Sequence, residues 1–550
     1  MSRAVFFTAS VLLYASTIII ATLTLNAYFA QTWDVTTFIH AARRFTEGGN
    51  PFDLYAQSHA AETWPYAYPP LHAFVIAIAL LVGDTLHVLP DYVWARVPVI
   101  LADIGVGLLL YRIVQRKSRD ELLARIALLV WLFNPVTFYD TAVQGHFESE
   151  WLLCVLLAYA WYEESHSSVL PSIALAVAVL FKQVAILFAI PVWMAMLKAE
   201  GRRVKDEAFH PAKRSLILHP LARIAFSVTL FVAVVGLVCL PYLLYSNDFL
   251  YMNLTYVENV PVQTQSWIVA LLGVTRASRD AFTSDFILLR CQTFVTLFAA
   301  AAIAFFAARR GLSLYLAGTL IALAFFLTSK KVMGYYNVIL FPFAFAEMLP
   351  RKRFDLALIT ILATAWIALS PYYADWGNPN HWWIYALLGA LNSALFVWMF
   401  LQCLSLRGAI FATKQSPQTD SEIASQKSLA MTRPTIFITL GLFAGAAFAA
   451  FLQPLAQNAS SPIRAPIIAP GMEGSALAAF GALVALVVIA LALMSRFVVG
   501  VVAPGQRAQA HTTIVAWAIV LVFAPLFFSA YYLTKESTAI FEIALKALGV

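Results

Sequence analysis

Long apolar runs, separated by short polar segments, extend over almost the whole chain. A run of about 17–25 apolar residues can cross the hydrocarbon core of a bilayer as a single helix. The runs lie near residues 4–25, 92–114, 122–139, 150–163, 168–181, 183–198, 219–244, 284–308, 312–328, 333–349, 354–370, 383–406, 434–453, 475–495 and 512–532. This pattern predicts an all-α, polytopic integral membrane protein with about 13–15 transmembrane helices.

The basic residues sort into alternate gaps between these runs. Most of the 36 Lys and Arg residues fall near residues 112–125, 198–223, 309–310, 351–353 and 407–433. Cytoplasmic loops of membrane proteins collect Lys and Arg, so these gaps are expected on the inside. The N-terminus is then also inside, and a large first loop, residues 26–91, is outside.

The first external loop has helical patterns of its own. Between residues 33 and 45, apolar side chains recur at helical spacing, which predicts an amphipathic helix at the membrane interface. The Gly-Gly-Asn-Pro segment 48–51 should end that helix, and the prolines before Leu71 open a second apolar stretch that reaches Val82. Apolar runs of only about 10–14 residues are more often re-entrant or interfacial, so we expect this stretch to stay outside.

Three regions follow from this organisation. Residues 1–400 form the predicted transmembrane core with its external loop. Residues 402–433 are rich in Ser, Gln and Lys and are expected to form a flexible cytoplasmic linker. Residues 434–550 carry three further apolar runs and few charges, as in a peripheral transmembrane addition to the core.

Composition agrees with the membrane class and excludes others. Hydrophobic residues make up 61% and charged residues 12% of the chain, whereas soluble domains hold about 45–50% and 25%. The net charge of +7 follows from the basic loops and does not indicate nucleic-acid binding, because no soluble segment interleaves basic and aromatic residues. The four cysteines lie in apolar runs without paired spacing, so neither a disulfide framework nor a zinc site is expected.

Motifs for nucleotide or metal chemistry are missing from the sequence. No Walker A loop, Gly-x-Gly-x-x-Gly helix opening or His-Glu-x-x-His pair is present. We therefore expect no cofactor and no metal. The remaining candidates are ionisable residues on the predicted outer side at or near membrane depth, where charge is costly and usually functional.

Asp34 lies about nine residues after the first apolar run ends. A carboxylate held near the bilayer surface is suited to act as a general base. The alternative is structural, because Asp at a helix start accepts hydrogen bonds from the N–H groups of the next turn. Spacing alone leaves both interpretations open.

A polar loop between two apolar runs, residues 143–150, offers His146 and Glu148 as substrate ligands. Ordinary loop solvation and capping of the following helix is the alternative. Lys182 is the one charge in an apolar stretch and predicts the tip of a helical hairpin. There it can attract a phosphate at reduced dielectric or extend its amine to the interface.

Lys330 and Lys331 stand together on the side that is poor in basic residues. A substrate phosphate or an anionic lipid headgroup would compensate them. If the predicted topology is wrong at this point, they are ordinary inside anchors. Among the many aromatic residues, most should form an interfacial belt, and a minority, with Trp33, Tyr68 and Tyr335 as candidates, can contact a sugar.

Together these motifs resemble the GT-C superfamily of membrane glycosyltransferases that use polyprenyl-phosphate-linked sugars. Their order is similar to that in bacterial polyprenyl-phosphate-mannose-dependent α-mannosyltransferases and in the catalytic subunit of the first GPI mannosyltransferase. The resemblance rests on Asp34, Asn50-Pro51-Phe52, Tyr68-Pro69-Pro70-Leu71, Phe133-Asn134-Pro135, Gly145-His146-Phe147, Lys182 with Pro191, and Lys330-Lys331-Val332 before Tyr335-Tyr336. The GPI enzymes carry Asp-x-Asp where this chain has Trp33-Asp34-Val35, which leaves the sugar open.

The resemblance implies an activity and partners. Asp34 would take the proton of an acceptor hydroxyl on an extracytoplasmic glycolipid or glycan, as that oxygen displaces polyprenyl phosphate with inversion. Lys182, Lys330 and Lys331 would stabilise the leaving phosphate. Mannose is the favoured sugar, a bacterial inner membrane the expected location, and metal dispensable.

A transporter or flippase for a lipid-linked saccharide is the alternative function. Such a protein should bury charged residues at mid-bilayer on several helices and show repeat symmetry. Arg290, about six residues into its apolar run, is the main hint of that kind.

Overall fold

The computed structural model describes residues 3–28, 33–48, 50–55, 65–209, 220–246, 248–256, 262, 264, 266–275, 287–369 and 382–405. Every regular element within these ranges is helical. The elements are α1 (Arg3–Tyr28), α2 (Trp33–Arg43), η1 (Pro51–Leu54), α3 (Leu71–Leu86), α4 (Asp91–Trp94), α5 (Val97–Ser118), α6 (Glu121–Leu132), α7 (Pro135–Phe138), η3 (Tyr139–Gln144), α8 (Glu148–Ser165), α9 (Val169–Phe181), η4 (Gln183–Ala185), α10 (Ile186–Phe209), α11 (Pro220–Tyr245), α12 (Asp248–Leu250), η6 (Tyr251–Thr255), α14 (Trp267–Thr275), α16 (Ile287–Arg290), α17 (Gln292–Arg310), α18 (Leu314–Thr328), η7 (Gly334–Ile339), α19 (Leu340–Met348), α20 (Phe354–Leu369) and α21 (Trp382–Ser405).

Four of the described helices are long and apolar enough to cross a membrane: Arg3–Leu23, Asp91–Ser118, Ala222–Tyr245 and Gln292–Arg310. A fifth results if Glu121–Leu132 and Val136–Ala142, bent by 41°, count as one span. Shorter apolar helices accompany them. The all-α membrane class is confirmed at this level, whereas the number of spans and the GT-C-like arrangement stay predictions.

The C-terminal regions expected from the sequence lie largely outside the described residues. α21 runs through Ser405, so the predicted linker 402–433 begins inside a helix, which corrects its first boundary. The rest of the linker and the addition 434–550 fall outside the described part of the chain.

Some helices of this fold expose apolar side chains at the surface of the bundle, and others are buried inside it. Leu237 of α11 and Phe294 and Phe298 of α17 are strongly exposed, as expected for side chains that face lipid tails. α18, in contrast, is buried along most of its length. An interior helix of that kind can be shorter than the bilayer is thick.

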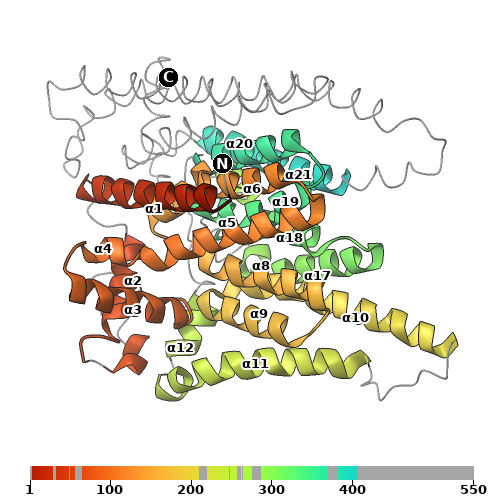
Figure 1. Cartoon of the computed structure of the whole chain (residues 1–550), viewed down its shortest axis with the longest axis horizontal. Coiled ribbons are helices and arrows are strands. Elements are labelled where there is room, and N and C mark those ends of the chain that lie inside the picture. The colour runs from red at the N-terminus through yellow and green to blue at the C-terminus, as the bar shows by residue number, and fades with distance from the viewer. Residues whose placement is uncertain are drawn as a thin grey trace, which may run out of the picture.

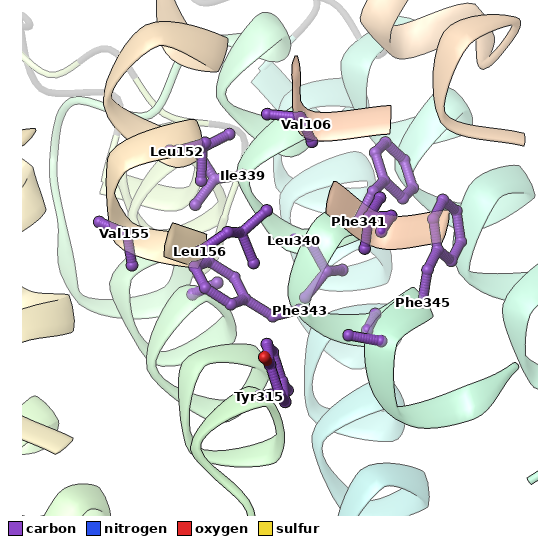
Figure 2. Close-up of a cluster of buried hydrophobic side chains, with 14 of the residues drawn as sticks. Val106, Leu152, Val155, Leu156, Tyr315, Ile339, Leu340, Phe341, Phe343 and Phe345 are labelled. Atoms are coloured by element: carbon purple, nitrogen blue, oxygen red, sulfur yellow. The ribbon is translucent and has the colours of Figure 1, made fainter. Parts of the chain in front are cut away.

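The core joins α8, α18 and α19. Figure 2 shows Leu152 and Leu156 of α8 directed toward the side chains of η7 and α19, among them Phe343. Helix α18 approaches this layer closely at Gly318, where a Cβ atom would stand 2.8 Å from the Phe343 ring. Close approach of this kind is a common use of glycine between apolar helices.

Several predicted spans are interrupted, and two of them border the candidate site. The run 122–139 ends as α6 at Leu132, and Asn134 then accepts a hydrogen bond from the backbone N–H of Val136 at 2.8 Å, next to Pro135, which has no N–H of its own. A π-helical turn, η3, follows. The run 333–349 starts as the 3₁₀ turn η7 before α19.

The segment predicted as the first external loop folds back onto the helices. α2 packs against α3 and α4, and these elements gather at one end of the bundle, on the left of Figure 1. The predicted amphipathic helix is confirmed, with Phe38 and Ala42 fully buried against protein. Arg43 at its end donates to Asp84 at 2.6 Å and to Asp91 at 2.7 Å, which ties α2 to both neighbours.

Candidate active site

Asp34 and His146 meet where α2 covers the loop between η3 and α8. His146 Nε2 lies 3.0 Å from Asp34 Oδ2. The Asp34 side chain is 33% exposed, while that of His146 is fully buried. One Asp34 carboxylate oxygen is therefore held by His146, and the carboxylate is still accessible to solvent.

Aromatic rings fix the orientation of His146. Its ring stacks on Tyr335 with centroids 3.8 Å apart, and Phe38 meets it edge-on at 5.8 Å. An ionised carboxylate only accepts hydrogen bonds, so we assign the proton of the neutral imidazole to Nε2. The other nitrogen, Nδ1, faces Glu148 Oε1 at 4.0 Å.

Gly145 allows α2 to come close to the loop that carries His146. Its φ of +63° lies in the left-handed region, and a Cβ atom there would stand 2.4 Å from Val35 Cγ2. Val35 is buried, so α2 and the loop are in tight contact at this point.

Lys182 sits at the predicted hairpin tip, between α9 and η4, and this local prediction is confirmed. Its amine points inward and donates to Glu148 Oε1, while Trp151 Nε1 donates to Glu148 Oε2 at 2.6 Å. Snorkelling to the interface is therefore wrong, because Lys182 is buried. The amine also lies 4.2 Å from the ring centroid of Tyr336 and 5.4 Å from that of Tyr68.

The two lysines after α18 have separate environments. Lys331 is partly exposed and close enough to Asp34 for its charge to act on that carboxylate. Lys330 is buried, and its backbone N–H donates to Gln292 Oε1 of α17 at 2.7 Å. Of this pair, Lys331 is the one near Asp34.

Burial and charge set the protonation of this site. Burial raises the pKa of Asp34, but the attraction and hydrogen bond of His146 and the charges of Lys331 and Lys182 outweigh it and leave that pKa below its ordinary value of 3.8. Burial lowers the pKa of His146, against the opposing effect of Asp34. Both shifts favour an ionised Asp34 beside a neutral His146 at pH 7.

The remaining predicted residues are placed as follows. Glu148 and His146 are fully buried, which rules out ordinary loop solvation and argues against direct contact with substrate in this conformation. Tyr68 is half-buried against Phe38 and Phe147. Trp33 is the first residue of α2, and its side chain lies outside the described part of the structure. Arg290 is exposed rather than buried in the bundle.

A second set of buried polar residues was not proposed from the sequence. Asp103 of α5 accepts hydrogen bonds from the hydroxyls of Tyr14, Ser149 and, at 2.7 Å, Thr141. His72 Nδ1 of α3 lies 2.8 Å from Glu150 Oε2, behind Phe147. Asp103 was visible as a lone carboxylate inside an apolar run, a signal of the kind used for Lys182.

Among the residues that the structure describes, no three His, Cys, Asp or Glu side chains come together as a metal site. No protein-family model matches this chain, and no curated protein sequence matches it.

Proposed function

We propose that this protein is a membrane glycosyltransferase that moves a sugar, mannose favoured, from a polyprenyl-phosphate donor to a hydroxyl of an extracytoplasmic glycolipid or glycan. One observation carries the proposal. The Asp34 carboxylate is open to solvent on one side, held by the buried His146 on the other, and accompanied by the cationic Lys331.

That geometry suits general-base chemistry. Asp34 Oδ1 takes the proton of the acceptor hydroxyl while Oδ2 stays hydrogen-bonded to His146 Nε2. The acceptor oxygen forms a bond to the anomeric carbon as the bond from that carbon to the phosphate oxygen breaks, which inverts the configuration. The bonding electron pair leaves with polyprenyl phosphate.

A cation beside the departing phosphate lowers the barrier, because negative charge grows there in the transition state. Lys331 is the better candidate, since no carboxylate of the described residues lies within ion-pair distance of its amine. Lys182 already has Glu148 as a counter-ion, and its contribution is to complete the wall of the site with Tyr68 and Tyr336. Polyprenyl chains fit the location, because α1, which contacts η3, and α11, which contacts α9, are of membrane-spanning length.

The test uses purified protein in detergent with radiolabelled polyprenyl-phosphate mannose and a membrane glycolipid extract as acceptor. Asp34→Asn should keep donor binding and lower turnover by about 10²–10⁴-fold. Asp84→Asn is the matched control, because Asp84 is an external carboxylate whose partner Arg43 also holds Asp91, and its turnover should stay within a few-fold. An Asp34→Asn enzyme with near-parental turnover would end the proposal.

A transporter of lipid-linked saccharide is the second candidate, favoured by the buried pairs Glu148–Lys182 and His72–Glu150 inside the bundle. The same assay separates the two. Detergent micelles have no compartments, so a transporter forms no new glycosidic bond there, whereas the enzyme releases free polyprenyl phosphate.

A further inference from the structure

Asp140 is a buried carboxylate that the proposed chemistry does not use. It lies in the π-helical turn η3 and is fully buried, and neither of its carboxylate oxygens has a hydrogen-bond partner within the described part of the chain. An ionised carboxylate in such a place is very costly unless a positive charge or donors accompany it.

Two more buried oxygens on neighbouring elements are in the same situation. Thr137 Oγ1 of α7 and Asn337 Oδ1 of η7 have no hydrogen-bond partner among the described residues. The Asn337 amide is oriented, because its Nδ2 donates to the carbonyl of Gly334 at 2.8 Å and so directs Oδ1 the other way. The three elements that carry these residues, α7, η3 and η7, all pack against one another and form one junction.

The charged groups around Asp140 hydrogen-bond to other partners. Glu148 pairs with Lys182, and Asp103 accepts three hydroxyl hydrogen bonds. Arg96 donates to the backbone carbonyls of Thr141 and Tyr92. Glu148 and Asp103 lie close enough to act on Asp140 by their charge and make a negative charge there more costly, while the more weakly acting Lys182 opposes them.

We propose that Asp140, Thr137 and Asn337 ligate a small monovalent cation of the Na⁺ class at the junction of α7, η3 and η7. Hard cations take carboxylate, amide, hydroxyl and backbone carbonyl oxygens, which are the groups present. A helix break followed by a π turn leaves backbone carbonyls without regular helical partners, as at ion sites in other membrane helices. One carboxylate neutralises one positive charge, so a monovalent ion fits better than a divalent one.

A proton on Asp140 is the alternative source of positive charge. It would supply one donor, and the Thr137 hydroxyl carries another, but none of the three groups hydrogen-bonds to another of them, whereas a cation uses all three oxygens as acceptors at once. The ion would also hold the active-site loop, because the backbone N–H of His146 donates to the carbonyl of Asp140 at 3.0 Å. This inference does not depend on the proposed glycosyl transfer.

The experiment measures thermal unfolding of the detergent-purified chain in NaCl, KCl, LiCl and N-methylglucamine chloride at one ionic strength. Na⁺ should raise the apparent Tm by about 2–5 °C over N-methylglucamine, as expected for a ligand that binds the folded state alone. Thr137→Val, which keeps the side-chain shape, should remove most of that shift, as should Asp140→Asn. Asp84→Asn should keep it.

Direct binding of ²²Na⁺ to the parent chain gives a readout that needs no variant to fold. Saturable binding lost in Thr137→Val supports the site. The proposal is overturned if the parent chain binds no ²²Na⁺, or if all four salts give the same Tm. A Tm that depends on pH and not on the alkali cation also overturns it and assigns the charge to a proton.

Discussion

Lys182 and Glu148 show how this fold accommodates two buried charges as an ion pair. Two charges taken out of water must recover their solvation from each other and from added hydrogen bonds. The pair does so through the Lys182 amine, the indole N–H of Trp151 and the faces of Tyr336 and Phe147. Loss of one partner leaves the other charge buried alone.

Lys182→Met should therefore destabilise the protein strongly, by about 3–5 kcal/mol. Lys182→Met combined with Glu148→Gln should recover a large part of that loss, because the second change removes the stranded carboxylate. Thermal unfolding of the two single variants and the double variant measures the coupling. If the two single losses simply add in the double variant, the pair is not a unit.

Lys331 makes a pH prediction. Burial lowers the pKa of Lys331 to about 8, with Lys182 adding to the effect and Asp34 opposing it. If its charge assists the leaving phosphate, kcat/KM for the donor should fall as pH rises through about 8. In Lys331→Arg that decline should move to higher pH, because guanidinium stays charged.

The free energy of unfolding should rise with pH above about 8, where kcat/KM is expected to fall. The unfolded chain holds the Lys331 proton up to its ordinary pKa of 10.5, and the folded chain releases it from about 8. Between these values the folded state gains stability with rising pH. The Tm difference between the parent chain and Lys331→Met should therefore shift in favour of the parent as activity declines, and parallel declines would contradict the assignment.

Residues differ in how far the sequence predicts them. Asp34 and Lys182 are isolated charges at the edges of apolar runs, a pattern visible in one dimension, and both reach the site. The roles of His146 and Glu148 depended on packing, since a polar loop looks solvated until α2 and the α9–α10 tip cover it. The Lys182–Glu148 pair joins positions 34 residues apart and could not be derived from spacing.

At the scale of elements, the apolar runs predicted most helices within a few residues, for example α9 and α11. Burial in lipid and burial in protein need the same run of apolar side chains. The length of a run did not predict where a helix breaks. η3 and η7 lie inside apolar runs, and their hydrogen bonds depart from the helical pattern through Asn134, Pro135 and tertiary contacts that run length does not reveal.

The loop between η3 and α8 gives a prediction at this scale. Gly145→Ala should lower turnover by about 10²-fold, because a new methyl collides with Val35 and displaces the neighbouring His146. Adding Val35→Ala removes the shortest contact and leaves the left-handed backbone strain, about 1–2 kcal/mol, with a 3.0 Å approach to the Arg96 guanidinium. Partial recovery of turnover in the double variant is expected, and no recovery would assign the effect to the backbone and Arg96.

At the scale of the whole molecule, α5 separates two charged regions. Its 22 residues cover about 33 Å at ~1.5 Å per residue, close to the thickness of the hydrocarbon core of about 30 Å. Arg96, at its start, borders the candidate active site. At its end, Arg116 pairs with Glu163 and Glu164 at 2.8 and 2.7 Å, and Lys117 lies 3.8 Å from Glu347.

This separation makes the predicted topology testable with two single cysteines. Thr85 is exposed near the end of α3, in the predicted external loop, and Lys352 is exposed in the basic turn between α19 and α20. In a background with the four native cysteines replaced by alanine, Thr85→Cys should react with a membrane-impermeant maleimide in intact cells. Lys352→Cys should react only after permeabilisation, because Arg351 to Arg353 are expected on the cytoplasmic side.

Cys291 is exposed, so the cysteine-free background is the necessary blank. Labelling of Lys352→Cys in intact cells, with Thr85→Cys protected, would invert the topology and place Asp34 in the cytoplasm, away from any extracytoplasmic acceptor.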